Sequence, residues 1–234
     1  MDLIETNNGG IRHPWELSRF HCLSNEIKTY HKEGSILDIG CGDSFFDREL
    51  LKTTININEM YGVDIFLEND FDENNYHVVN SYEKLNGKKF DTIIMFDVLE
   101  HIEKDDEFLN NQVEHLLKED GKVIITVPAF QFLFSEHDKF LKHFRRYDKK
   151  MIKKLVEKSN FKIVDFHYFY FSLFMFRLLF RNDSNDLSEW KHDEKSLITK
   201  FIISILNIDY LLSKLFGKVL PGLSLFVILK KDFQ

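Results

Sequence analysis

The chain has 234 residues and a net charge of −7, with 44% hydrophobic and 29% charged residues. These values are typical of a globular protein with a sizeable core, and the acidic balance disfavours a broadly basic nucleic-acid-binding surface. Two cysteines, Cys22 and Cys41, indicate neither a disulfide framework nor a zinc site of paired cysteines. Residues 1–10 lack the pattern of a signal peptide, and no apolar run reaches the roughly twenty residues of a spanning helix. We therefore expect a cytoplasmic protein.

Apolar runs of strand length recur along the chain, most of them ending at glycine, aspartate or proline. The seven predicted strands are residues 35–39, 60–63, 77–79, 90–96, 122–127, 161–169 and 223–229. Helices are predicted at residues 42–52, 104–118 and 149–159, with a turn at Asp120-Gly121. Because strands that alternate with helices favour parallel βαβ units, the pattern predicts a doubly wound α/β sheet. Ligands of such sheets bind outside the carboxyl ends of the strands.

An insertion, residues 171–220, separates the sixth and seventh predicted strands. Its second half, residues 197–220, has helical periodicity. The apolar residues expected to share one face of this helix are Phe201, Ile205, Ile208, Leu212, Leu215 and Val219. Aromatic residues also crowd residues 168–180. We favour core packing and a lid over the acceptor pocket, and two alternatives are a homodimer interface and contact with a membrane surface.

The segment 36–44, with the sequence ILDIGCGDS, is the most informative. An apolar run ends there and the chain turns sharply into a helix. Gly40 and Gly42 can adopt backbone angles closed to other residues, and the helix start offers unpaired N–H groups. Asp64 ends the next strand, where it can accept hydrogen bonds from two ribose hydroxyls. The glycine pair alone could also mark a dinucleotide site or merely a tight turn, and the full spacing from Asp38 through Asp64 to residues 90–101 favours a nucleoside-containing cofactor. A nicotinamide dinucleotide is disfavoured because Phe45 stands at the position of the last glycine in G-x-G-x-x-G.

Four segments together resemble class I S-adenosylmethionine-dependent methyltransferases. They are LDIGCG at 37–42, YGVD at 61–64, FDTIIMFDVLEHI at 90–102 and DGKVIITVP at 120–128. The resemblance covers roughly residues 12–170 and 223–230. It implies one Rossmann-like domain with a seven-stranded, mostly parallel sheet whose last strand is reversed. The implied parts of this domain, 1–234, are an N-terminal cap helix (1–33), a cofactor-binding core (34–170), a helical insertion or lid (171–220) and the last strand (221–234).

The resemblance implies S-adenosyl-L-methionine as the cofactor and gives residues their roles by position. Asp38 lies near the methionine amino group, Asp64 binds the ribose, and Ile65 lies beside the adenine. The implied cofactor-binding residues are Arg19, Asp38, Gly40, Cys41, Gly42, Asp64, Ile65, Ser81, Tyr82, Phe96 and Asp97. Ser44 replaces the family's usual third glycine, so we expect a tighter turn or a slightly displaced cofactor.

Residues 128–148 follow the fifth predicted strand, where the acceptor should enter. His137 and His143, together with Asp97, are the predicted catalytic residues, since a histidine or carboxylate can take a proton from an acceptor hydroxyl. The predicted substrate-binding residues are Trp15, His137, Arg145, Arg146 and Tyr147. The arginines could clamp a phosphate or carboxylate. Alternatively, they pair with acids of the protein itself, His137 is a loop residue and Trp15 packs in the core.

Residues 12–20, 128–148 and 221–231 resemble methyltransferases encoded with bacterial surface-polysaccharide and glycosyltransferase enzymes. This implies O-methylation of a small-molecule, sugar, nucleotide-linked or phosphorylated acceptor in polysaccharide biosynthesis, in the cytoplasm or at the inner membrane surface. The alternatives are a non-catalytic protein that retains the cofactor, and an RNA methyltransferase, which the acidic charge disfavours; no nucleic-acid partner is expected. Asp97-x-x-Glu100-His101 with His137 or His143 could also bind a divalent metal. The same motif is widespread in metal-free relatives, so no metal is predicted.

Overall fold

The computed structural model describes residues 14–179 and 197–232, and residues 1–13, 180–196 and 233–234 lie outside the description. Eight strands form one sheet in the described residues, in the order β3-β4-β2-β1-β5-β6-β8-β7. The strands are β1 (Gly34–Ile39), β2 (Ile57–Val63), β3 (Phe71–Glu73), β4 (Tyr76–Val79), β5 (Phe90–Phe96), β6 (Leu117–Pro128), β7 (Phe161–Phe169) and β8 (Ser224–Lys231). Strand β8 runs antiparallel to both β6 and β7, which confirms the predicted reversal of the last strand.

The prediction of seven strands is wrong by one. Strand β3 pairs antiparallel with β4 at the edge of the sheet, while β1, β2, β4, β5 and β6 pair in parallel. Its three residues, Phe71 to Glu73, are half-buried or exposed and mostly polar, so no apolar alternation marks them in the sequence. The predicted turn at Asp120-Gly121 also lies inside β6. The register of β6 against β5 shifts at this point, where Leu117 pairs with Phe90 and Lys122 pairs with Thr92.

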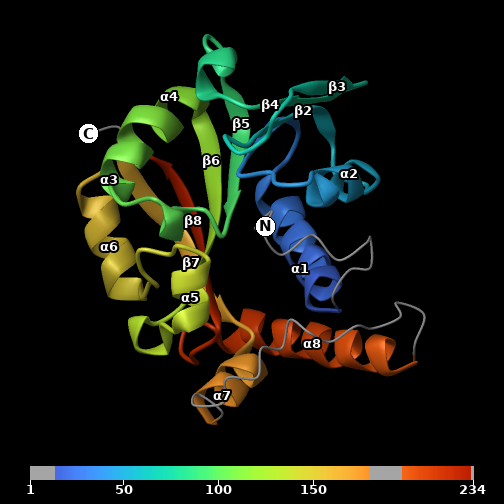
Figure 1. Ribbon diagram of the computed structural model, residues 1–234, viewed down its shortest axis with the longest axis vertical. Coiled ribbons are helices and arrows are strands. Elements are labelled where there is room, and N and C mark those ends of the chain that lie inside the picture. The colour runs from blue at the N-terminus through green and yellow to red at the C-terminus, as the bar shows by residue number, and fades with distance from the viewer. Residues whose placement is uncertain (1–13, 180–196, 233–234) are drawn as a thin grey trace.

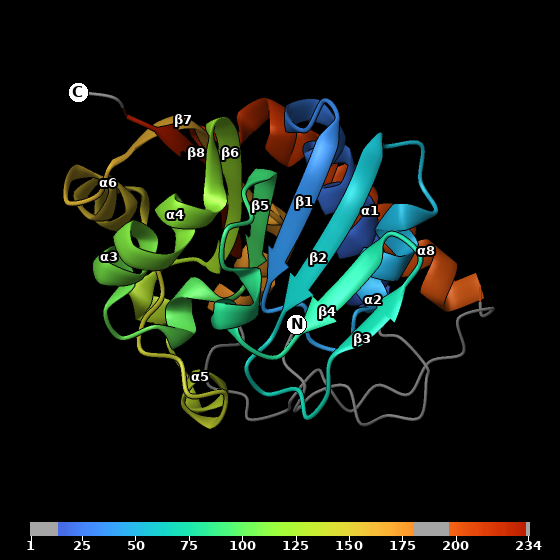
Figure 2. The ribbon, with the colours of Figure 1, turned by 90° about the horizontal axis from the view of Figure 1, so that it is seen from above.

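Helices cover both faces of the sheet (Figures 1 and 2). The helices are α1 (Pro14–Tyr30), α2 (Phe45–Leu51), α3 (Asp105–Phe108), α4 (Glu114–Leu116), α5 (Glu136–Phe140), α6 (Lys149–Glu157), α7 (Phe171–Leu179) and α8 (Leu197–Phe216). A π-helical turn, η3 (Leu109–Val113), joins α3 to α4, and three 3-10 turns are η1 (Tyr82–Leu85), η2 (Leu99–His101) and η4 (Gln131–Leu133). Two apolar clusters result, one beneath α4 and α6 and one beneath α1, α2 and α8. This two-sided burial explains why the central parallel strands are mostly apolar toward their carboxyl ends.

Helix α8 runs beside α1 (Figure 1). Its apolar stripe faces outward, because the side chains of the stripe are exposed. We define the outward stripe by its members, all at least 44% exposed: Phe201, Ile205, Ile208, Leu212, Leu215 and Val219. The face that packs on the protein is mixed. Leu206 and Tyr210 are buried with Asp209, which accepts hydrogen bonds from the Ser172 N–H (3.0 Å) and hydroxyl (2.6 Å). Buried polar contacts therefore set the rotation of this helix.

The aromatic segment that precedes α8 is largely core. Tyr168, Phe169, Tyr170 and Phe174 are buried, whereas Phe176 is exposed. Phe180 lies outside the described residues. Within residues 14–179 and 197–232, no helix has the length and apolarity needed to cross a membrane.

Candidate active site

The turn after β1 has the geometry of a nucleotide-binding loop. Gly40 and Gly42 have φ values of +78° and +55°, where a side chain is strained. The Gly40 N–H donates to the Val63 carbonyl at 2.7 Å, and a Cβ at Gly40 would lie 2.6 Å from Cγ2 of Val98. Ser44 has a φ of 64°, so the residue that replaces the third glycine adopts a glycine-like backbone. The strand-to-helix turn is thus retained at the cost of strain.

Asp64 is held against this turn at the carboxyl end of β2. Its carboxylate accepts hydrogen bonds from the Gly42 N–H at 3.0 Å and from the Phe66 N–H at 2.9 Å. The next residue, Ile65, is exposed, as is Phe66. A fixed carboxylate beside two exposed apolar side chains suits a ribose with its attached base.

Asp38 is a buried carboxyl near the carboxyl end of β1. Its Oδ1 has no hydrogen-bond partner among the described residues. Burial, together with the nearby Asp47 carboxylate, raises the pKa of Asp38 well above its usual value. Burial likewise raises the pKa of Asp47 to about 7, although the Tyr76 hydroxyl donates to its carboxylate at 2.6 Å. A buried carboxyl of this kind is ready to receive a cation.

Arg19 joins α1 to the ends of β5 and β6. It forms a half-buried ion pair with Asp97 and donates to the Thr126 hydroxyl at 2.7 Å. Burial alone would raise the pKa of Asp97, but the charge of Arg19 holds it below its usual value. Trp15 lies on the same helix and packs on Tyr170, with ring centroids 4.4 Å apart. The cap helix therefore contacts the edge of the sheet that carries the predicted cofactor residues.

Other predicted cofactor residues line the same edge. Cys41 is buried, and Phe96 is buried edge-on against Phe46. Ser81 precedes η1, and Tyr82 begins it and packs on Phe108. All of these residues follow or end parallel strands, as the resemblance implies, and their binding of the cofactor stays a prediction.

Several residues after the strands have strained backbones. Ser44, Asp97, Phe130 and Tyr170 have φ values between 56° and 65°, and they follow β1, β5, β6 and β7. The carboxyl ends of these strands share one edge of the sheet, since β7 and β6 both run antiparallel to β8. Strained non-glycine residues of this kind concentrate at functional sites.

The predicted acceptor segment, residues 128–148, is held against the residues after β5 by hydrogen bonds and an ion pair. Tyr147 is buried, and its hydroxyl shares its proton between the Asp105 carboxylate (2.8 Å) and the Leu99 carbonyl (3.1 Å). Arg145 pairs with Asp105 at 2.8 Å. Nε and Nη2 of Arg146 donate to the two carboxylate oxygens of Asp138, at 2.7 and 3.0 Å. The protein's own acids therefore engage both arginines, and an acceptor role for these three residues stays a prediction.

The same docking brings His143 to Glu100 and His101 of η2. The rings of His101 and His143 are nearly perpendicular, with centroids 4.6 Å apart. Burial and the nearby Asp97 raise the pKa of Glu100 well above its usual value. His137, the other predicted base, lies on α5 and outside this group. Glu100 and His101 are predicted only as part of the alternative metal site, and Asp138 is absent from the predicted site residues. The signal for all three is the acidic and histidine pattern of 97–101 and 136–143.

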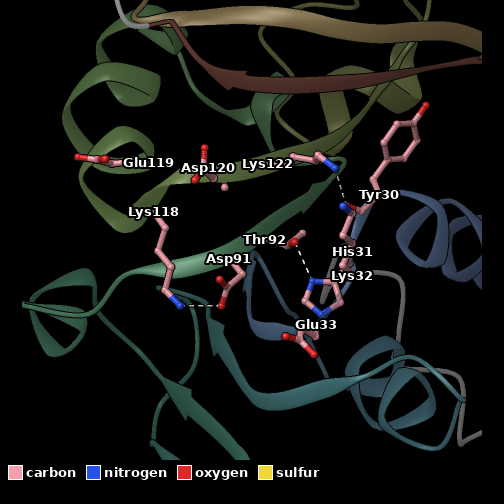
Figure 3. A pocket seen from close by; sticks show the side chains of 11 residues that line it. Tyr30, His31, Lys32, Glu33, Asp91, Thr92, Lys118, Glu119, Asp120 and Lys122 are labelled. Carbon is pink, nitrogen blue, oxygen red and sulfur yellow. Dashed lines mark hydrogen bonds and ion pairs between the residues drawn. The ribbon is translucent and has the colours of Figure 1, made fainter.

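A cavity of about 420 Å³ opens at the opposite edge of the sheet (Figure 3). Its lining includes His31, whose Nδ1 lies 2.8 Å from the Thr92 hydroxyl, and Lys118, which pairs with Asp91 at 2.7 Å. These residues lie near the amino ends of β1, β5 and β6. Because ligands of parallel α/β sheets bind at the carboxyl ends, this cavity is not the cofactor site.

Comparison with known families assigns the fold. A family model described as a methyltransferase domain matches residues 19–165, more than half of the chain. The chain belongs to the methyltransferase family. The match includes Arg19, Asp38, Asp64, Asp97 and His143, and it confirms the predicted class of this methyltransferase.

Curated relatives match about half of the methyltransferase. The ubiquinone biosynthesis O-methyltransferase of Rickettsia typhi is 29% identical over 128 residues, which are 50% of this chain and 51% of the relative. The protein of the same name from Rickettsia bellii is 27% identical over 128 residues, 50% of this chain and 53% of the relative. The chain thus spans about half the length of the curated relatives it matches.

Solved structures share the fold over nearly the whole chain. A SAM-dependent methyltransferase from Archaeoglobus fulgidus is 21% identical, with a TM-score of 0.52 and coverage of 92% of this chain and 97% of that one. Phosphoethanolamine N-methyltransferase 2 of Haemonchus contortus, in complex with S-adenosyl-L-methionine, is 15% identical, with a TM-score of 0.56 and coverage of 99% and 57%. At such identities these likenesses concern the fold alone.

Proposed function

We propose that this methyltransferase transfers the methyl group of S-adenosyl-L-methionine to an oxygen of a small-molecule acceptor. The observation that carries the cofactor assignment is the buried Asp38 carboxyl, whose Oδ1 accepts no hydrogen bond from a described residue. Asp38 precedes Gly40 by two residues, and the Gly42 N–H of the same loop donates to the Asp64 carboxylate. In this arrangement the methionine ammonium group of the cofactor lies beside Asp38, its ribose binds Asp64, and its adenine lies beside Ile65. S-adenosyl-L-methionine is the cofactor.

The sulfonium cofactor supplies the reactive methyl group. During transfer the acceptor oxygen forms a bond to the methyl carbon, the carbon–sulfur bond breaks, and its electron pair stays on sulfur. The protein has to align the two partners, exclude water and take one proton from the acceptor hydroxyl. We assign the proton to a group of the predicted catalytic set, His137, His143 or Asp97. Asp97 is the weakest base of the three, because its pairing with Arg19 lowers its pKa.

Two lines of support bear on the acceptor. The curated relatives are named O-methyltransferases of ubiquinone biosynthesis, which favours a hydroxyl acceptor on a small molecule. The resemblance of residues 128–148 to polysaccharide-associated enzymes favours a sugar, nucleotide-linked or phosphorylated acceptor. We keep polysaccharide biosynthesis as the proposed setting, with a non-catalytic cofactor-binding protein and an RNA methyltransferase as the alternatives.

Calorimetry tests the cofactor assignment. Wild type should bind S-adenosyl-L-methionine, and Asp64→Ala should lose that binding because the ribose partner is removed. Asp72→Ala is the matched control, since its carboxylate is 80% exposed on the short strand β3. Absence of binding by folded wild type, or equal binding by Asp64→Ala, would refute the assignment. Methyl transfer from labelled cofactor to phenols, sugar phosphates and RNA then separates the acceptor classes and the non-catalytic alternative.

We also propose that the outward stripe of α8 contacts an anionic membrane surface. Six apolar side chains of the stripe are exposed, and Leu211 and Phe216 beside them are exposed as well. Asp209 is the single acidic residue of α8 and is buried, while Lys200 and Lys214 are exposed on the same helix. An apolar face bordered by lysines suits the interface of an acidic membrane.

Vesicle sedimentation tests this contact. Wild type should sediment with phosphatidylglycerol vesicles, and the double variant Leu212→Ser, Leu215→Ser should stay in solution. The control Lys139→Ser changes an exposed position on α5, away from the stripe. Absence of sedimentation, together with a dimer on size-exclusion chromatography that the double variant abolishes, would assign the stripe to a second copy of the chain instead.

A further inference from the structure

Glu100, His101 and His143 form a compact group beside the predicted methyl-transfer site. One ligand atom from each of the three residues lies within 4.8 Å of the others. Glu100 is 0% exposed, and neither of its carboxylate oxygens has a hydrogen-bond partner among the described residues. A buried carboxylate without a partner is costly, and native proteins satisfy such groups with a hydrogen bond, a cation or a metal ion.

We propose that Glu100, His101 and His143 bind a divalent transition-metal ion that holds the oxygen of the methyl acceptor. Only the role given to the acceptor oxygen rests on the proposed function. Binding of the ion itself depends on the three side chains. It assigns His143 as a ligand, which leaves His137 as the histidine that takes the proton.

The surroundings of His143 are those of a metal-binding histidine. Its Nδ1 lies 3.0 Å from Oδ1 of Asp138, a buried carboxylate that also binds Arg146 and the Ser135 N–H. Because a carboxylate can only accept, Nδ1 donates the proton of this hydrogen bond, and Nε2 is the ring nitrogen that a metal ion would use. A carboxylate that orients the second nitrogen in this way is the usual support of a metal-bound imidazole.

Hydrogen bonds to the carbonyls of η2 set the position of the ligands before any ion binds. The Phe144 N–H, next to His143, donates to the Glu100 carbonyl at 2.8 Å. The Tyr147 hydroxyl donates to the Leu99 carbonyl at 3.1 Å. These bonds join the 128–148 segment to η2 on both sides of the group. Ligands that are placed by the scaffold bind an ion without the entropy cost of ordering a loop.

The donor set indicates the kind of ion. One carboxylate oxygen and two imidazole nitrogens suit zinc, manganese or iron(II), whereas magnesium and calcium prefer oxygen ligands alone. Three protein ligands leave coordination positions open for a substrate oxygen. Glu100 follows the end of β5 by four residues, close to Asp97, so an oxygen on the ion would lie at the edge where the cofactor residues gather.

An ion at this place would make the acceptor hydroxyl more acidic. A divalent cation lowers the pKa of a bound hydroxyl, so that the alkoxide or phenolate forms near neutral pH. The hydroxyl proton passes to His137 or to solvent, the oxygen forms its bond to the methyl carbon, and the carbon–sulfur electron pair stays on sulfur. No oxidation or reduction takes place.

Metal titration tests the site directly. Protein freed of metal by dialysis against a chelator is titrated with zinc and with manganese, with magnesium for comparison. Wild type should bind one equivalent of zinc or manganese and bind magnesium more weakly. Glu100→Gln and His143→Gln should each lose that binding, and Asp138→Asn should weaken it about 10–100-fold through the orientation of His143. His115→Gln is the control and should bind like wild type, because His115 is an exposed histidine of α4.

Cofactor binding separates the metal site from the proposed function. Each folded variant should still bind S-adenosyl-L-methionine in calorimetry without added metal. The proposal is overturned if wild type binds the cofactor but takes up neither zinc nor manganese. It is equally overturned if Glu100→Gln and His143→Gln bind the metal like wild type. Cobalt(II) absorption gives a second readout, since imidazole ligation should produce a visible spectrum in wild type that His143→Gln lacks.

Discussion

Replacing Arg146 by methionine distinguishes a structural arginine from an acceptor-binding one. The side chain is 8% exposed and contacts both carboxylate oxygens of Asp138, at 2.7 and 3.0 Å. Asp138 is itself 0% exposed. Methionine keeps most of the length and apolar volume of arginine but removes its charge. The variant would therefore leave a buried carboxylate without its main cation.

The expected loss follows from the partners that Asp138 retains. Breaking a buried ion pair by removing one member costs about 3–5 kcal/mol. The Ser135 N–H and hydroxyl, at 2.8 and 3.0 Å, and the His143 ring continue to bond Asp138. We therefore expect the lower part of that range, about 3 kcal/mol, in the free energy of unfolding. Asp138→Asn combined with Arg146→Met should lose less than the sum of the two single variants, because no buried charge is left.

Urea unfolding followed by circular dichroism measures this loss. Lys139→Met is the matched control, since it removes an exposed ion pair to Glu136 and should cost below about 0.5 kcal/mol. The reasoning is refuted if Arg146→Met unfolds within about 1 kcal/mol of wild type. If such a variant also has a raised KM for the acceptor, Arg146 binds the acceptor, as the sequence predicts.

Three further predictions concern the cofactor loop. Ser44→Gly should raise the free energy of unfolding by about 1 kcal/mol, because glycine tolerates the φ of 64°; Ser44→Ala is the control and should show no such gain in urea unfolding. Gly40→Ala should lose about 2–3 kcal/mol through its positive φ and the contact at 2.6 Å with Val98, and adding Val98→Ala should restore part of this loss; unchanged stability would contradict the loop geometry. Asp47 keeps its proton up to a pKa of about 7 in the folded state but loses it near 3.8 when unfolded, so the free energy of unfolding should fall as the pH rises between these values, on the order of 4 kcal/mol in all. Asp47→Asn should flatten that fall, and an equally steep pH profile in the variant would show that other carboxyls cause it.

Much of the fold follows from local patterns. The predicted strands 90–96 and 161–169 have the bounds of β5 and β7 in the structure. Strand β5 is an apolar run buried in the sheet, whereas β7 is an edge strand that is buried mainly over its last three residues, where aromatic residues mark it. Gly40, Gly42 and Asp64 could likewise be predicted to lie together, because the ends of neighbouring parallel strands meet at one edge. Short polar elements such as β3 carry no comparable signal.

The sequence by itself determined the class of protein and the parallel sheet, and it predicts the place of the cofactor. The tertiary structure decided the surroundings of each polar side chain. Periodicity predicts an apolar stripe on α8 but not its direction, because the rotation depends on Asp209 bonding to Ser172 of another helix. The partners of Arg146, and the meeting of His143 with Glu100, likewise depend on how the loop docks. The physical reason is that hydrophobic periodicity acts within one element, whereas ion pairs and ligand sets form between elements distant in sequence.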